Sequence, residues 1–238
     1  TPFEVAVPLF GHDAPSHEAT SRTPGSFEQT MAGLENLRRH RAPGQRVEIR
    51  VIMTRIQLKS LAGLLDMILE RLSWVDQVVF LFVELEGFAE AYRSRVMLTM
   101  SEAAGALDAL HGRLERLPQA RLYHFPLCAV PERLWPFVYN TLAPFKVTWL
   151  DGCRSECVHR EQCVGVHRSY VKHMGAPDIR PIRRASALIL TLLVLLVAWL
   201  ILGGKGMSEL ARTAGKWTAE LQAMANDFRR QIEVATAR

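Results

Sequence analysis

Two kinds of hydrophobic pattern alternate over the first 125 residues. Short apolar runs at residues 3–10, 47–53, 78–83 and 121–125 have the length and composition of strands. Between them, leucines and other apolar residues recur every three or four positions, as on one face of a helix. The predicted order is β-α-β-α-β-α-β, which favours parallel strands joined by helical crossovers.

Local signals mark the ends of these elements. Ser26 with Gln29 three residues later predicts a capping box, and Ser101 predicts the start of a later helix. The polar stretch at 11–25 follows a strand, so we expect it at the carboxyl edge of the sheet, where α/β folds bind ligands. Four strands suit either a small doubly wound sheet or the second half of a larger barrel.

The remainder of the chain differs in character. Residues 126–184 are rich in proline and hold all four cysteines, which predicts an irregular region organised by a bound ion or cluster. Residues 185–204 carry no charge, and a helix of that length at about 1.5 Å per residue spans roughly 30 Å, the thickness of a bilayer core. We therefore predict a transmembrane helix there, with a buried core helix as the alternative.

An amphipathic helix is predicted at residues 207–238. Its apolar residues step by four and three positions, which is a heptad pattern: Leu210, Ala214, Trp217, Leu221, Met224 and Phe228. This pattern suits an oligomerising coiled coil, which would make the chain a homo-oligomer, and equally a helix lying on a membrane or on its own domain.

Composition and charge exclude some classes. The mean hydropathy of +0.04 excludes both a disordered chain and a polytopic transporter. The net charge of +5 is spread along the chain without a basic stripe interleaved with aromatic residues, so we expect no nucleic-acid partner.

The cysteines form the strongest chemical signal. Cys153, Cys157 and Cys163 read C-x3-C-x5-C, and Cys128 lies upstream of them. Thiolates bind both zinc and iron–sulfur clusters, and a compact triplet with one distant ligand suits a [4Fe-4S] cluster better than paired zinc knuckles. Zinc, and disulfides or free thiols, remain the alternatives. The nearby His159, His167 and His173 could replace a ligand, but the favoured interpretation of each is a surface or hydrogen-bonding histidine.

These cysteines lie in a stretch that resembles a known enzyme family. The segments VAVPLFGHDAPSHEATSRTPGSFEQTMAGLENL, QRVEIRVIMTR and RLYHFPLCAVPERLWPF, followed by the cysteine triplet, are similar to radical S-adenosylmethionine peptide maturases, most closely the His-Xaa-Ser system branch. The resemblance covers about residues 3–182. It implies an enzyme that uses S-adenosylmethionine to modify a ribosomally made peptide, with an auxiliary cluster held by the four cysteines.

The chain departs from the family in its cysteines. The C-x3-C-x2-C motif, which holds the cluster that cleaves S-adenosylmethionine in that family, is missing, and the cysteine triplet has one extra residue between Cys153 and Cys157. We therefore expect an α/β chain that is the C-terminal half of a (βα)6 partial barrel. The expected domains are the partial barrel at 1–125, the cluster region at 126–184, the transmembrane helix at 185–204 and the amphipathic helix at 207–238.

The resemblance also suggests cofactor contacts. Arg50 lies in an otherwise apolar strand and could bind a carboxylate, although a strand-edge arginine facing solvent is an alternative. Glu84, with Glu86, follows the third strand and could touch cofactor or substrate, or else lie in a solvated loop.

The cluster also implies a location. Because such clusters are assembled in the reducing cytoplasm, we expect a single-pass membrane protein with residues 1–184 cytoplasmic. The arginines before residue 185 agree with this orientation, whereas the cations after residue 204 weaken the bias. The alternative function is a non-catalytic, membrane-anchored metal-binding module with an oligomerising tail.

Overall fold

The computed structural model describes residues 3–183, 196–197, 199–201 and 212. The chain divides into two compact units, Thr1–Arg183 and Arg184–Arg238. The fold described here is that of the first unit. The predicted helix at 207–238 lies outside the described residues except for Arg212, and most of the predicted span at 185–204 does so as well.

The first unit alternates strands with helices and then becomes irregular. The strands and α-helices are β1 (Glu4–Pro8), α1 (Ala14–Ser21), α2 (Ser26–His40), β2 (Arg46–Met53), α3 (Arg55–Leu58), α4 (Leu61–Arg71), β3 (Gln77–Phe82), α5 (Phe88–Ala91), α6 (Arg93–Val96), α7 (Met100–Asp108), α8 (His111–Leu114), β4 (Gln119–Tyr123), β5 (Val138–Tyr139), β6 (Val147–Thr148), α9 (Asp151–Ser155), β7 (Val166–His167) and α10 (Arg168–Met174). Short 3-10 turns follow β4 and separate the last elements: η1 (Leu127–Ala129), η2 (Glu132–Phe137), η3 (Pro144–Lys146) and η4 (Arg160–Gln162).

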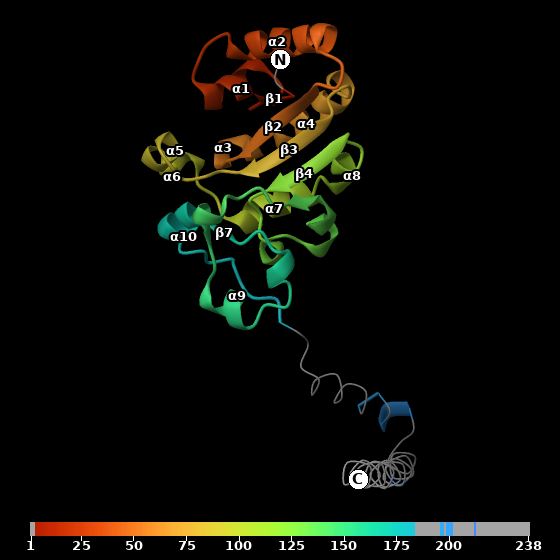
Figure 1. Cartoon of the computed structure of the whole chain (residues 1–238), viewed down its shortest axis with the longest axis vertical. Helices are drawn as coiled ribbons and strands as arrows, with labels where there is room; N and C mark the ends of the chain where they lie inside the picture. The colour runs from red at the N-terminus through yellow and green to blue at the C-terminus, as the bar shows by residue number, and fades with distance from the viewer. Residues whose placement is uncertain (1–2, 184–195, 198, 202–211, 213–238) are drawn as a thin grey trace, which may run out of the picture. The chain divides into compact units, whose positions relative to one another are not determined.

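A parallel sheet forms the centre of the unit, with the strand order β1-β2-β3-β4-β5. Figure 1 labels the first four of these strands. The four strands predicted from the apolar runs are confirmed, and so is their parallel direction. The crossovers through helices explain that direction, because consecutive parallel strands cannot be joined by a tight turn. β6 and β7 form a separate antiparallel pair.

One face of the sheet carries the hydrophobic core. Val47, Ile49, Val51 and Met53 alternate along β2 and are fully buried. Their partners in β3 and β4 are also apolar, and the whole set packs with buried residues of α4, α7 and α8. Burial of these side chains stabilises the sheet by roughly 25 cal/mol for each Å² removed from water.

The opposite face of the sheet is polar. The register places Glu48 of β2 beside Gln77 of β3 and Gln119 of β4. One step further along the strands, Arg50 lies beside Val79 and Arg121. An all-parallel sheet usually has apolar residues on both faces, so this row of polar groups distinguishes the second face.

The helix boundaries correct several predictions. Ser26 opens α2, but the capping position is Gly25 with φ 78°, and no side chain caps the helix. Thr99 with Glu102, rather than Ser101, forms the capping box of α7. Both errors arise because serine, threonine and glycine stand together before these helices, and the backbone conformation decides which of them is the cap.

The polar stretch at 11–25 also contains a helix that the apolar pattern did not indicate. Asp13 and Ser16 form the capping box of α1, and a proline lies in the first turn. The helix buries only His17, so it has no apolar stripe for the periodicity to reveal.

The predicted fold class is wrong. The predicted half-barrel of four strands ending at residue 125 is instead a mixed α/β unit whose sheet gains a fifth strand, β5, from the region assigned to the cysteines. No helix among the described residues is both long enough and apolar enough to cross a bilayer. The fifth strand was missed because it has two residues, and its identity depends on pairing with β4 rather than on a local pattern.

Candidate functional site

The four cysteines line one cavity, although they come from separate parts of the irregular region. Cys128 lies in η1, Cys153 lies in α9, and Cys157 and Cys163 lie on either side of η4. The rest of the wall is mainly apolar: Pro126, Leu127, Trp149, His159, Gly165, Val166, Ile179 and Ile182. The structure therefore brings together the four side chains that the sequence grouped only by spacing.

The spacing of the sulfurs distinguishes between kinds of metal centre. Among the described residues, the only ligand atoms found in a group of three within 4.8 Å of one another belong to Glu84, Glu86 and His167, so no three of the sulfurs are that close. Four thiolates around one zinc ion lie about 3.8 Å apart, because each Zn–S bond is about 2.3 Å. A cubane cluster holds its cysteines farther apart, since each sulfur binds a different iron. The sulfurs would have to move closer together to bind a single zinc ion.

Burial and hydrogen bonds shift the pKa values of these thiols in opposite directions. Burial raises the pKa of Cys128 to about 11 and also raises the pKa of Cys153 and of Cys163. Backbone N–H groups of Leu127, Val164 and Gly165 hydrogen-bond to Cys163 and favour its thiolate. Hydrogen bonds of this kind tune the potential of sulfur-bound clusters. A bound metal would replace the thiol protons, so its binding depends on pH.

Gly165 allows the chain to close the cavity. Its φ of +75° lies in the left-handed region, and an added Cβ would lie 2.4 Å from Val147 Cγ1. The turn at Gly165 leads from Cys163 directly into β7. Val166 of β7 then lines the cysteine cavity.

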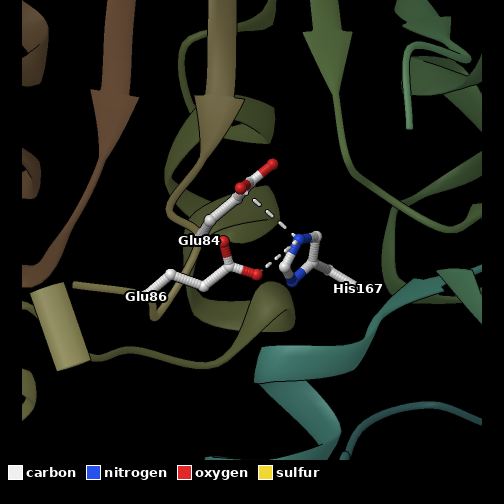
Figure 2. A group of neighbouring side chains, drawn as sticks. All are labelled: Glu84, Glu86 and His167. Carbon is white, nitrogen blue, oxygen red and sulfur yellow. Dashed lines mark ion pairs between the residues drawn. The ribbon is translucent and has the colours of Figure 1, made fainter. Parts of the chain in front are cut away.

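His167, the next residue, belongs to a different cluster at the carboxyl end of β3. Its Nε2 lies 3.5 Å from Glu84 Oε2 and 3.6 Å from Glu86 Oε1. Figure 2 shows both carboxylates directed at the imidazole ring. Lys146 Nζ lies 2.5 Å from Glu84 Oε2 and 3.2 Å from Glu86 Oε2, and His124 Nδ1 lies 3.6 Å from Glu84 Oε1.

The electrostatics of this cluster follow from its burial and its charges. Desolvation lowers the pKa of His124 to about 4 and also lowers the pKa of His167, so both imidazoles are neutral at pH 7. The pKa of Glu84 is lowered: burial alone would raise it, but the hydrogen bond and charge of Lys146, with the charges that the two histidines acquire in acid, outweigh the burial. The cluster therefore contains two carboxylates and one ammonium group, with neutral rings between them.

The two predicted cofactor contacts lie in different environments. Glu84 belongs to the cluster just described. Arg50 lies on the polar face of the sheet, where its Nε and one terminal nitrogen bind Glu48 Oε1 at 2.8 and 2.6 Å. Glu48 is the buried partner that the sequence pattern gave no reason to expect.

Sequence reasoning also missed His124 and Lys146 as members of the cluster, and it treated His167 only as a neighbour of the cysteines. The position of His124 was a usable signal, since it directly follows β4 at the edge where α/β sheets bind ligands. Lys146 carried no such signal, because only the folding of η3 brings it to the glutamates.

A larger cavity of about 470 Å³ opens near the carboxyl ends of β1, β2 and β3. Its walls are mostly apolar and include Ile52, Val83 and Phe88, with Arg22 and Arg95 as the charged groups. Ligand pockets have similar volumes and similar walls. A cavity of this size and lining can hold a small, largely apolar group.

Comparison with known proteins gives one match. Residues 191–231 match the model of the mttA/Hcf106 family. No curated protein and no solved structure matches the chain. The family match covers a minor part of the chain, and it indicates that the chain associates with a membrane.

Exposed apolar side chains in the second unit agree with this association. Its described residues include large apolar side chains that are half or more exposed: Leu196, Val197, Trp199, Leu200 and Ile201. A contiguous group of this kind marks a surface that binds another apolar phase or partner.

Proposed function

We propose that the chain holds an iron–sulfur cluster through Cys128, Cys153, Cys157 and Cys163. The observation that carries the proposal is the common cavity lined by four sulfurs, no three of which are close enough for a single zinc ion. Such a cluster, with a thiolate on each iron, would supply electron transfer at a low potential when bound. The thiolates, the backbone N–H groups around Cys163 and the apolar wall would hold it and keep water away.

We further propose that this cluster serves a radical S-adenosylmethionine enzyme that modifies a ribosomally made peptide. The resemblance of residues 3–182 to that family supports the proposal, and the cavity at the carboxyl ends of the strands offers a place for a peptide side chain. Because clusters are assembled in the cytoplasm, residues 1–184 would lie on the cytoplasmic side of the membrane.

A second candidate function is a non-catalytic, membrane-associated metal-binding module. It is favoured by one observation, the lack of a C-x3-C-x2-C motif in the 238 residues. Cleavage of S-adenosylmethionine by the chain, reconstituted alone with iron and sulfide, would exclude this second function.

Anaerobic reconstitution of the full chain with iron and sulfide tests the cluster. We expect about four irons per chain and the broad visible absorbance of a cubane cluster. Cys128→Ser and Cys157→Ser should each lose most of the iron, whereas Ser155→Ala, an exposed change on α9, should keep it. A colourless protein that retains one zinc ion would refute the cluster.

A further inference from the structure

The cluster of glutamates and histidines at the carboxyl end of β3 is independent of the cysteine cavity and of the proposed function. Glu84 and Glu86 come from the segment that follows β3, His124 follows β4, and His167 ends β7. Figure 2 shows the side chains of Glu84, Glu86 and His167 meeting at one edge of the sheet. His124 comes from a third segment, and its Nδ1 lies 3.6 Å from Glu84 Oε1.

His124 presents a free lone pair to this cluster. The residue is 7% exposed, and its Nδ1 is buried without a hydrogen-bond partner. Its ring hydrogen-bonds to the backbone of Phe82, so the other nitrogen carries the proton and Nδ1 is unprotonated. An unprotonated nitrogen facing the Glu84 carboxylate at 3.6 Å places two acceptors against each other, an arrangement that a cation between them would relieve.

The backbone also holds His124 in an unusual conformation. Its φ is +68°, in the left-handed region that side chains other than glycine rarely adopt. Strain of this kind persists where the surrounding structure fixes a side chain for a function.

His167 is oriented by Ser169. The residue is 1% exposed, and its Nε2 is buried without a hydrogen-bond partner. Its Nδ1 lies 2.8 Å from Ser169 Oγ. The same hydroxyl accepts the N–H of Leu85 at 2.9 Å. Since Leu85 lies between the two glutamates, one hydroxyl fixes both the ring and the carboxylate-bearing segment. Nδ1 accepts the backbone N–H of Ser169 at 3.2 Å, so the neutral ring carries its proton on Nε2, facing the glutamates. A metal ion at Nε2 would move this proton to Nδ1, where Ser169 Oγ can accept it, the usual outer contact of a ligating histidine.

The distances suit one ion. Ligand atoms bound to the same metal at about 2.1 Å lie roughly 3.0 to 3.4 Å apart. The contacts of 3.5 and 3.6 Å between Nε2 of His167 and the carboxylates are slightly wider than this. A small inward movement of the glutamates would complete the coordination.

The ammonium group of Lys146 balances the negative charge of Glu84 and Glu86. It contacts both glutamates, it is 30% exposed, and it lies in the short turn η3 at the surface. A lysine on such a turn can swing into water at little cost, so the carboxylates would remain available to another cation.

We propose that the two glutamates and the two histidines form a binding site for a divalent first-row transition-metal ion, whose place Lys146 takes when no ion is bound. Mixed imidazole and carboxylate ligands select iron, manganese or zinc over magnesium and calcium, which prefer oxygen alone. This proposal assigns Glu84 to a metal ion rather than to S-adenosylmethionine.

Titration of the full chain with Mn²⁺, followed by the electron paramagnetic resonance of the free ion, tests the site. Manganese is chosen because it avoids thiolates, so the cysteine cavity does not contribute. We expect one bound ion per chain, and Glu84→Gln should weaken its affinity by at least about tenfold. Lys146→Met should strengthen it, because a competing cation is removed; a merely structural ion pair would not give this result.

Glu90→Gln is the matched control. Glu90 also contacts a lysine and a histidine, Lys172 and His173, but it lies outside the cluster. Its substitution should leave Mn²⁺ affinity unchanged. The proposal is overturned if neither the wild-type chain nor Lys146→Met binds Mn²⁺, or if Glu84→Gln and Glu90→Gln have the same affinity.

Discussion

The buried carboxylate of Glu48 is the residue on which the polar face of the sheet depends. It is 1% exposed, and it accepts hydrogen bonds from Arg50 and from Gln77 Nε2, the latter at 2.7 Å. Removing a carboxylate from water costs several kcal/mol, which only close partners offset. Arg50 therefore has a structural role, whether or not it also contacts a cofactor.

Arg50→Met should destabilise the fold by about 2 to 3 kcal/mol, because it leaves the buried charge of Glu48 without its cation. The estimate is at the low end for buried pairs, since the Arg50 side chain is 37% exposed. Adding Glu48→Gln to the same chain should recover most of the loss, because the uncompensated charge is removed. Urea unfolding at pH 7 measures both variants, and equal stability of the single and double variants would contradict this role.

At the scale of elements, the turn between Cys163 and β7 connects the cysteine cavity to the glutamate–histidine site. Gly165→Ala should destabilise the fold by about 2 to 4 kcal/mol, because a Cβ at positive φ is strained and would collide with Val147. The same variant should lose bound iron, since the turn positions Cys163. Thermal unfolding and iron analysis check both effects.

Gly33→Ala is the control for that change. Gly33 lies within α2, and an added Cβ there has no atom within 4 Å. Alanine in a helix interior should stabilise the fold by about 0.5 to 1 kcal/mol. If Gly165→Ala and Gly33→Ala changed the stability of the fold by the same amount, the role assigned to the turn at Gly165 would be contradicted.

The sequence predicted the elements whose signals are local. The long strands and their parallel direction followed from apolar runs separated by helical periodicity, and the cysteines were grouped by their spacing. β5 was missed because its pairing with β4 is a non-local property. His124 was missed because Phe82, which orients it, becomes its neighbour only when the sheet forms. His167 was missed because Glu84 and Glu86 come close to it only when the irregular region packs against the sheet.

At the scale of the whole molecule, the second unit is expected to bring the chain to a membrane. The match of residues 191–231 to the mttA/Hcf106 family and the exposed side chains near Trp199 support this. Trp199→Asp combined with Leu200→Asp should reduce flotation of the full chain with lipid vesicles, because a charge is costly among lipid tails. Phe145→Asp, at a 70% exposed aromatic residue of the first unit, should leave flotation unchanged. Equal flotation of all three chains would contradict this assignment.

The two residues of β7 have a consequence for the energetics of the whole unit. Val166 forms part of the cysteine cavity, and His167, the next residue, faces the glutamates. A ligand that fixes β7 from one side reduces the entropy that must be lost when the other side is filled. By thermodynamic linkage the effect is reciprocal. If a bound iron–sulfur cluster raises the affinity of the glutamate–histidine site for its metal ion by some factor, the bound metal ion raises the affinity of the cysteines for the iron–sulfur cluster by the same factor.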